Sequence, residues 1–252
     1  MKKSKDEKIN FKKMPNLIYG RKPVLSFLQT NGVEKIYLDE RFSQAEILKE
    51  IAKQKVEVEK VTIKKLDELT AKSNHQGIAA IIKQFNYASL DEIIFDSKKE
   101  TNPLIIMLDE IQDPHNFGAI LRTCAYFNVG GVIIKKHQQV PLNATVAKVS
   151  TGALNFVKVC QVTNLSNALE ILKDNGFWIV STDLKEAVSF EDVDYLRPIV
   201  LILGSEGKGV SPLLNKRSDY VVKIPVSGKI QSLNVSVAAG ILINFISSRK
   251  IK

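Results

Sequence analysis

The chain has 252 residues, enough for one large domain or two of ordinary size. Hydrophobic residues make up 44% and charged residues 25%, which is typical of a globular protein that buries a sizeable core. No apolar run approaches the roughly 18 residues of a membrane helix, and no apolar segment follows the basic N-terminus as in a signal peptide. We therefore expect a cytoplasmic protein.

The charge balance favours a polyanionic partner. Lys and Arg number 36 against 27 Asp and Glu, a formal net charge of +9. This partner is more readily a nucleic acid than an anionic membrane. The alternative is that the excess of positive charge serves only solubility.

The two cysteines, Cys124 and Cys160, are far apart, and the three histidines are scattered. A disulfide framework and a metal site are therefore both unsupported, and a reducing compartment fits the sequence.

The first part of the chain predicts a basic tail and a small domain. Residues 1–16 are Lys-rich with little apolar content, so we expect a disordered tail that touches phosphates without specificity. Alternating and helically spaced apolar residues then predict a small α/β domain over residues 17–83. Its expected helices lie at 24–28, 44–54 and 63–69, and its expected strands at 33–38, 56–58 and 78–82. Residues 84–102 resemble a linker with one short helix at 90–95.

The remainder, residues 103–252, predicts a second α/β domain. Continuous apolar strands alternate with helices, a pattern that favours a mainly parallel sheet. The expected strands are 104–108, 131–134, 156–162, 177–181, 199–203 and 221–224, and the expected helices are 116–127, 143–153, 165–173, a turn after Pro212, and a last helix entered at 232–234. Trp178 is expected in the core. In the last helix the predicted apolar face is Val237, Ala238, Ile241, Leu242 and Phe245.

Three polar loops follow strands of this second domain. The first leaves the strand at 104–108 and enters a helix near Asn116, with Arg122 about a turn and a half further on. An Arg in an otherwise apolar helix needs an anionic partner, which is either a substrate group or a structural ion pair.

The second loop, Leu203-Gly-Ser-Glu-Gly-Lys-Gly-Val-Ser-Pro212, carries three glycines that let backbone groups approach a ligand closely. It matches neither the P-loop nor the dinucleotide fingerprint, so the sequence lacks the main motifs that would indicate ATP or NAD binding. Glu206 would repel a triphosphate but suits a cation or a hydroxyl donor.

The third loop connects the strand at 221–224 to the last helix. Pro225 and Gly228 open it, and Ser232 and Asn234 are residue types that cap a helix N-terminus. Because all three loops leave parallel strands, we expect them to meet at one edge of the sheet, where α/β proteins bind ligands.

Together the loops resemble a known family. Asn116-x-Gly118-x-Ile-x-Arg122-Thr, Gly204-Ser-Glu-Gly207 and Ser232-Leu-Asn234-Val-Ser-Val-Ala-Ala-Gly240 are similar, in order and spacing, to the three motifs of the SpoU–TrmH family of RNA ribose 2′-O-methyltransferases. Residues 17–82 resemble the ribosomal-protein-like substrate-binding domain of its rRNA-modifying branch, most of all in the bacterial 23S rRNA guanosine 2′-O-methyltransferases. The one mild departure is Cys124, where the family often has Ala.

The resemblance implies a SPOUT domain with a C-terminal trefoil knot, which the general rule against knots would not predict. It implies a homodimer without metal, bound S-adenosylmethionine and an rRNA substrate. The implied cofactor-binding residues are Gly204, Glu206, Gly207, Ile224, Leu233 and Asn234. The implied catalytic residues are Asn116, Arg122, Glu206, Ser232 and Asn234. Because free Arg resists deprotonation, we interpret Arg122 as a phosphate clamp that orients the ribose hydroxyl rather than as a base.

Three alternatives stay open at this stage. Within the enzyme class, the chain could methylate tRNA, or an rRNA adenosine as resistance enzymes do. Outside that class, it could be an RNA-binding protein that keeps the fold without methyl transfer. The intact Asn116, Arg122, Glu206 and Asn234 speak against this last alternative, and the N-terminal domain favours rRNA over tRNA.

Overall fold

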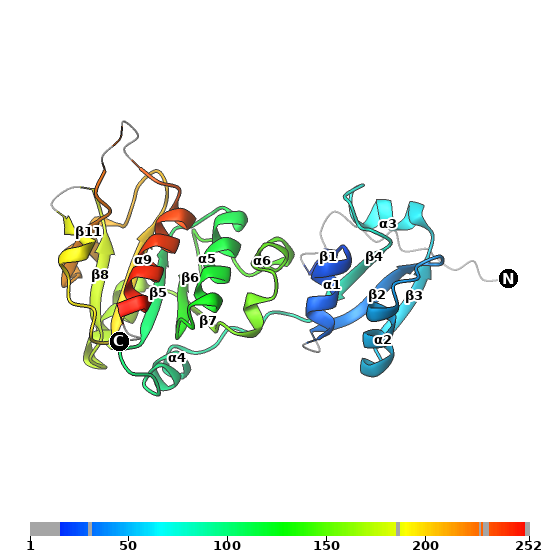
Figure 1. The fold of residues 1–252 in the computed structure, drawn as a ribbon, viewed down its shortest axis with the longest axis horizontal. Helices are drawn as coiled ribbons and strands as arrows, with labels where there is room; N and C mark the ends of the chain where they lie inside the picture. The colour runs from blue at the N-terminus through cyan, green and yellow to red at the C-terminus, as the bar shows by residue number, and fades with distance from the viewer. Residues whose placement is uncertain (1–15, 30–31, 185–186, 227, 229–231, 250–252) are drawn as a thin grey trace. The chain divides into compact units, whose positions relative to one another are not determined.

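The computed structural model describes residues 16–29, 32–184, 187–226, 228 and 232–249. These residues form two compact units that divide between Phe85 and Asn86 (Figure 1). Apart from residue 16, the expected basic tail lies outside the described residues. In the described part of the chain, no helix is long and apolar enough to cross a membrane.

The first unit is a four-stranded sheet with three helices among its described residues. Its elements are β1 (Leu17–Tyr19), α1 (Arg21–Leu28), β2 (Val33–Asp39), α2 (Ala45–Gln54), β3 (Glu57–Val61), α3 (Ile63–Leu69) and β4 (Ile78–Ile82). The strand order is β1-β4-β2-β3, and only β2 and β3 run parallel. The expected strands and helices are present, and β1, which has three residues, was too short for the pattern to predict.

The second unit alternates strands and helices. Its elements are α4 (Leu90–Ser97), β5 (Leu104–Asp109), α5 (Pro114–Tyr126), β6 (Gly131–Lys135), α6 (Ala144–Ser150), η2 (Ala153–Asn155), β7 (Val159–Val162), α7 (Leu165–Asp174), β8 (Trp178–Thr182), β9 (Val188–Ser189), η3 (Phe190–Asp192), β10 (Ile199–Gly204), α8 (Pro212–Arg217), β11 (Tyr220–Lys223) and α9 (Val235–Arg249). Helix α4 lies in the segment expected as a linker, and its Ile93 and Ile94 are buried in the core of this unit.

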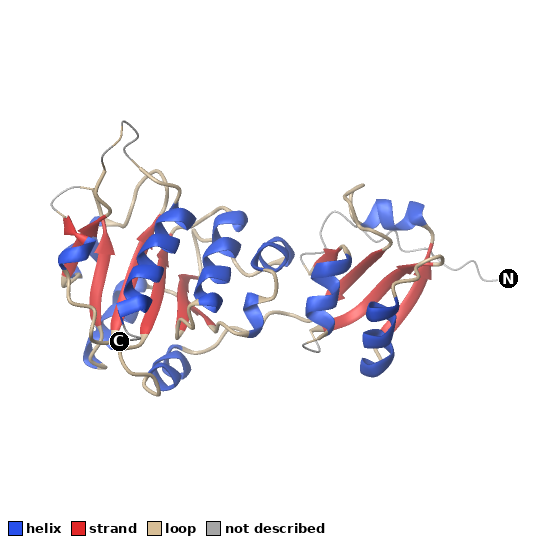
Figure 2. Cartoon of the chain, in the orientation of Figure 1, coloured by secondary structure: helices blue, strands red, loops and turns tan. Residues whose placement is uncertain are grey.

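The seven strands that the structure describes in this unit pair in the order β7-β6-β5-β10-β8-β11-β9, and every pair is parallel. Figure 2 shows helices flanking the strands. The mainly parallel sheet predicted from the sequence is thus confirmed. Because all strands run one way, their carboxyl ends share an edge, and the three polar loops leave the sheet there.

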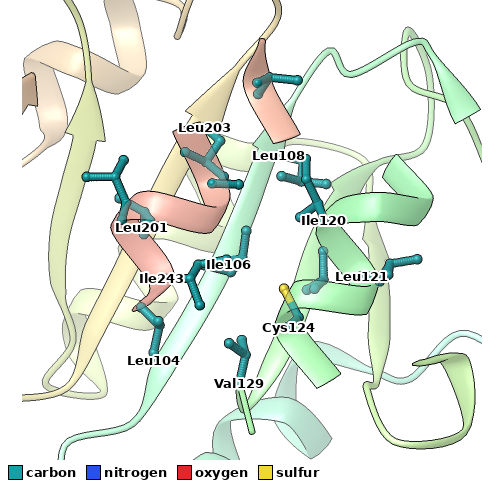
Figure 3. Close-up of a cluster of buried hydrophobic side chains, with 14 of the residues drawn as sticks. Leu104, Ile106, Leu108, Ile120, Leu121, Cys124, Val129, Leu201, Leu203 and Ile243 are labelled. Atoms are coloured by element: carbon teal, nitrogen blue, oxygen red, sulfur yellow. The ribbon is translucent and has the colours of Figure 1, made fainter. Parts of the chain in front are cut away.

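The sheet is buried on both faces. Side chains of β5 alternate: Leu104, Ile106 and Leu108 face one cluster, whereas Ile105 and Met107 face the other. Strand β10 alternates in the same way. The first cluster packs under α5 and α9, which lie side by side (Figure 3). The second packs under α4, α7 and α8. Two-sided burial explains why these strands are apolar throughout.

Two sequence expectations about packing are wrong. In α9 the buried face consists of Val235, Ala239, Leu242, Ile243 and Ile246. Of the expected face, Leu242 is buried and Phe245 packs against the core, but the covered side is rotated from the one expected. Val237 is 50% exposed and Ile241 is 36% exposed. A helix whose sequence is apolar nearly all round does not reveal by its pattern which side is covered.

Trp178 is not a core residue. Its side chain is 39% exposed and stacks on Tyr220, with ring centroids 5.8 Å apart. The guanidinium of Arg197 lies 4.3 Å from the centre of the Trp178 ring. This cluster lies at the amino end of the strands, opposite the three loops.

Candidate active site

The first two loops leave neighbouring strands at the same level. In the paired strands β5 and β10, Gly204 lies beside Asp109, the last residue of β5. Helix α5 begins at Pro114 rather than near Asn116, because Asp113 is its N-cap and accepts the amide proton of His115 at 2.9 Å. The cap sets Asn116 in the first turn of α5, at the carboxyl edge of the sheet.

The glycine-rich loop is a tight hairpin. The Gly209 amide donates to the Ser205 carbonyl at 2.8 Å. A Cβ atom on Gly204 would lie 2.0 Å from the Gly209 carbonyl carbon and 2.1 Å from the Val210 nitrogen. Gly204 therefore allows the return leg of the hairpin to fold against it, and any side chain there would displace backbone. A Cβ on Gly207 would meet nothing within 4 Å.

A polar network joins the three loops. Asn116 Nδ2 donates to Glu206 Oε1 at 3.0 Å, and Asn234 Nδ2 donates to Asn116 Oδ1 at 3.0 Å and also to Glu206 Oε1. Asn234 also caps α9, because its Oδ1 accepts the Ser236 amide at 3.0 Å. Asn116 is only 9% exposed. Residues 90 and 118 positions apart in the chain are thus held in one hydrogen-bonded cluster.

Arg122 lies on the exposed side of α5. Six residues turn a helix by about 600°, so Asn116 and Arg122 point in different directions although they share a helix. Within the described residues Arg122 forms no ion pair. The structural ion pair considered from the sequence is therefore not present there, and the guanidinium is available to an external anion. Gly118, between the two, is a packing residue: a Cβ there would lie 2.7 Å from Val149 Cβ on α6.

A cavity of about 1180 Å³ lies beside the hairpin. Six of the predicted site residues line it: Gly204, Glu206, Gly207, Ile224, Ser232 and Leu233. Asn116, Arg122 and Asn234 are not among the lining residues. Glu206 alone among the predicted residues both lines the cavity and binds Asn116 and Asn234. It therefore connects a ligand in the cavity to the first turn of α5.

Sequence reasoning missed the far end of this cavity. Thr182, Asp183, Asn215 and Lys216 also line it. Asn215 Nδ2 donates to Asp183 Oδ2 at 2.7 Å, and Asn215 Oδ1 is buried without a partner among the described residues. Asp183 directly follows β8. Its position at the carboxyl end of a strand of the parallel sheet could therefore have identified it as a candidate site residue. Nothing in the pattern pointed to Asn215.

Sequence reasoning also missed two acidic residues at the end of β5. Asp109 is 4% exposed, and its Oδ2 accepts the Ser211 amide at 2.9 Å. Glu110 Oε1 lies 3.1 Å from Lys135 Nζ, and its Oε2 lies 3.8 Å from Lys208 Nζ. The hydrogen bond from Lys135, with the nearby Lys208 charge, holds the pKa of Glu110 below its usual value.

Among the residues described, no group of three or more His, Cys, Asp or Glu side chains is placed to hold a metal ion. Both cysteines are free and buried. Burial raises the pKa of Cys160 to about 11 and raises that of Cys124 further. Neither thiol is therefore a ready nucleophile.

A parallel sheet with a cavity at its carboxyl edge, lined by a glycine-rich hairpin, defines an α/β ligand-binding enzyme domain. Comparison with known proteins narrows this class. The model of the SpoU rRNA Methylase family matches residues 103–244, and the model described as RNA 2′-O ribose methyltransferase substrate binding matches residues 17–88. The chain belongs to the SpoU rRNA methylase family and is an RNA methyltransferase with the SPOUT fold.

Three similar proteins illustrate the relationship. A Bacillus subtilis protein, provisionally named a TrmH family tRNA/rRNA methyltransferase, is 38% identical over 231 residues, which cover 89% of this chain and 92% of the relative. An AdoMet-bound rRNA methyltransferase from Sinorhizobium meliloti is similar in structure, with a TM-score of 0.78 at 22% identity over 94% of this chain and 87% of that one. The TrmH/SpoU tRNA modifying enzyme of A. aeolicus is 36% identical, with a TM-score of 0.55 over 64% of this chain and 80% of that one.

Proposed function

We propose that this protein transfers a methyl group from S-adenosylmethionine to the 2′-hydroxyl of a ribose in rRNA, most specifically a guanosine of 23S rRNA, in the cytoplasm. The observation that carries the proposal is the position of Glu206. It lines the cavity and is hydrogen-bonded to Asn116 at the start of the helix that carries Arg122. A cofactor in the cavity would then lie against this polar cluster, and an RNA phosphate held by Arg122 would lie on the exposed side of the same helix.

The cavity fits S-adenosylmethionine in chemistry. Its hairpin wall offers backbone groups at Gly204 and Gly207, while Ile224 and Leu233 supply apolar surface. Asn215 lines the cavity, and its Oδ1, which has no hydrogen-bond partner among the described residues, would accept a polar hydrogen of the ligand. The Glu206 carboxylate provides a negative charge that suits a cationic ligand. Pockets for ligands of this size combine apolar walls with a few fixed polar groups in this way.

The protein's contribution to the reaction is mainly positioning. S-adenosylmethionine, when bound, supplies an already activated methyl group. We assign Arg122 to hold the phosphate beside the target ribose through two parallel hydrogen bonds. Asn116, Glu206, Ser232 and Asn234 then form the polar frame that directs the 2′-hydroxyl and accepts its hydrogen bond. Asn116 and Asn234 hold one carboxylate oxygen of Glu206, which fixes the orientation of the other.

The first unit, residues 17–83, is assigned to RNA selection. Its match to the substrate-binding model supports this role. An exposed pair of basic residues, Arg21 and Lys22, opens α1 with no acidic side chain in that turn. Positive charge at a helix N-terminus is unfavourable without an anion nearby, so we assign these residues to phosphate contacts. The tRNA alternative keeps support from the similarity to the A. aeolicus tRNA modifying enzyme.

The proposed assembly is a homodimer that uses the outer face of α5 and α9. Tyr126 on α5 is 83% exposed, and Val237 and Ile241 are exposed on the adjacent α9. Gly240 lies between these two, with open space around it, so a second helix can approach closely. A two-fold interface here would place the partner subunit beside Arg122. Light scattering should give twice the chain mass, and Ile241→Asp should reduce it toward the monomer.

The deciding experiment has two readouts. Calorimetry with S-adenosylmethionine tests the cofactor, and mapping of 2′-O-methyl marks in rRNA and tRNA from a deletion strain tests the substrate. We expect micromolar binding and the loss of a single rRNA mark, as in typical enzyme–substrate affinities. Binding without any lost mark would favour the non-enzymatic RNA-binding alternative. A mark lost from tRNA would favour the tRNA enzyme, and one lost from an rRNA adenosine the resistance type.

A further inference from the structure

We propose that Asp109 is a positioning residue that locks the glycine-rich hairpin, residues 204–211, into the shape that binds the cofactor. The inference rests on the proposed function for what the hairpin binds, but the lock itself is a property of the unliganded protein. Asp109 does not line the cavity, so it would act only through the hairpin.

The first observation is the bond itself. Asp109 is the last residue of the interior strand β5 and is 4% exposed, yet it is an acidic residue. Its Oδ2 accepts the amide proton of Ser211, 102 residues away, at 2.9 Å. A buried carboxylate is costly unless it is hydrogen-bonded, and a charge-assisted bond to a backbone amide is among the stronger ones. An apolar residue would be the cheaper choice at this position if the hairpin needed no anchor.

The second observation is where the bond falls on the hairpin. Gly204 begins the hairpin directly beside Asp109 in the strand register, and Ser211 ends it. At the start, the missing side chain of Gly204 lets the Gly209–Val210 peptide fold back. At the end, Asp109 holds the returning chain. Both legs are therefore fixed to β5, and Glu206 at the tip is aimed at Asn116 and Asn234.

The third observation is the support around Asp109. Lys135 Nζ lies 4.0 Å from Asp109 Oδ1, so the carboxylate has a partially buried counter-charge. The next residue, Glu110, adopts a left-handed backbone with φ of 61°, and its side chain reaches Lys135 and Lys208. Such a conformation is uncommon for Glu and is kept where surrounding contacts demand it. Lys208 belongs to the hairpin, so its ion pair with Glu110 is a second, weaker contact between the hairpin and the residue that follows β5.

The chain offers a control at the amino edge, a more exposed aspartate with the same two kinds of partner. Asp219 also uses its carboxylate to hold a distant backbone amide, accepting from Ile179 at 2.7 Å, and it also pairs with a lysine, Lys173, at 3.0 Å. It directly precedes β11, at the amino end of the strands, and does not line the cavity. If Asp109 were merely structural, Asp109→Ala and Asp219→Ala would change stability and nothing else.

The test uses the full-length protein and the variants Asp109→Ala, Asp109→Asn and Asp219→Ala. Amide hydrogen exchange without ligand should be at least about 10-fold faster over residues 204–211 in Asp109→Ala, with no change over 176–183. Asp219→Ala should show the reverse. Asn offers a neutral acceptor about half as strong, so Asp109→Asn should speed hairpin exchange by roughly 3- to 10-fold. Unchanged hairpin exchange in whichever Asp109 variant folds would overturn the proposal.

Calorimetry on the same proteins adds the functional readout. We expect Asp109→Ala to weaken S-adenosylmethionine binding by about 10- to 100-fold, Asp109→Asn by only a few-fold, and Asp219→Ala not at all. Equal affinity for wild type and Asp109→Ala would also overturn the positioning role. If the wild type bound no S-adenosylmethionine, the proposed cofactor would be wrong, while the exchange result would still decide whether Asp109 locks the hairpin.

Discussion

The amino and carboxyl edges of the seven-stranded sheet carry similar polar residues, but these residues serve different purposes at the two edges. At the amino edge, Asp219 and the Trp178–Tyr220–Arg197 stack pair with close neighbours, and none of these four residues lines the cavity beside the hairpin. At the carboxyl edge, Asn116, Glu206 and Asn234 also pair with one another, but Glu206 lines a cavity of about 1180 Å³. Arg122, on the same helix as Asn116, forms no ion pair within the described part of the chain. Hydrogen bonding alone therefore does not mark function; the neighbouring space and unused charge do.

The largest expected effect comes from Arg122 at the carboxyl edge. Arg122→Ala should lower the single-turnover methylation rate at saturating RNA by at least roughly 100-fold, because losing one charged contact in the transition state costs about 3 kcal/mol. S-adenosylmethionine affinity should stay within a few-fold, since Arg122 does not line the cavity. Arg122→Lys should not restore the rate, because a point charge cannot form two parallel hydrogen bonds.

Arg217 provides the control for this prediction. Its guanidinium pairs with Glu170 at 3.0 Å on α7, so Arg217→Ala removes the same charge from a structural ion pair. That variant should keep the wild-type rate. A normal rate in Arg122→Ala, or an equal loss in Arg217→Ala, would remove Arg122 from the catalytic assignment.

The second effect separates two glycines of one hairpin. Gly204→Ala places a Cβ about 2.0 Å from the Gly209 carbonyl carbon, whereas Gly207→Ala meets nothing within 4 Å. We expect Gly204→Ala to weaken S-adenosylmethionine binding by about 10- to 100-fold, because overpacking of this kind costs about 1–3 kcal/mol. Gly207→Ala should stay within a few-fold. Calorimetry that ranks the two variants the other way would show that loop shape does not control binding.

Part of the fold and of the site could be predicted from the sequence, and the rest could not, for physical reasons. The parallel sheet was predictable because strands buried on both faces are apolar throughout, and the three loops because Gly, Pro and polar residues interrupt those strands. The network of Asn116, Glu206 and Asn234 was predicted as a group through the family resemblance, and the structure adds which atoms bond. The trefoil knot and the catalytic roles stay predictions.

Long-range pairings were beyond the sequence. No sequence pattern near either residue connects Asp109 to Ser211. An acidic residue at the end of an apolar strand does, however, indicate a buried carboxylate that needs a hydrogen-bond donor. The buried face of α9 was misjudged because Val237 and Ile241 are as apolar as the residues that are covered. Strand β9, with two residues, carries no periodicity to detect.

A third, smaller effect tests the amino edge. Trp178→Ala removes a ring that is 39% exposed and that contacts both Tyr220 and Arg197. Full removal of a buried Trp costs about 3–5 kcal/mol, so a partly exposed one should cost about 2 kcal/mol of unfolding free energy. Denaturant unfolding should show this loss while S-adenosylmethionine affinity stays unchanged. If Trp178→Ala instead lowered the S-adenosylmethionine affinity and left the unfolding free energy unchanged, the amino edge would not be purely structural.

The smallest effect concerns the pH dependence of Glu110. Its native pKa is lowered, chiefly by the hydrogen bond from Lys135, so the folded state favours the ionised carboxylate. The stabilisation is therefore present above the unfolded-state pKa of about 4.3 and is lost as the pH falls through the lower native value. We expect Glu110→Gln to melt slightly below the wild type at pH 7, and the difference to vanish at pH 3 or lower. High salt should shrink it at pH 7, because the carboxylate is only partly buried and the pair is screened. A difference that grows as the pH falls would mean that the ion pair with Lys135 does not stabilise the carboxyl edge, and that Glu110 is held in its left-handed conformation by packing alone.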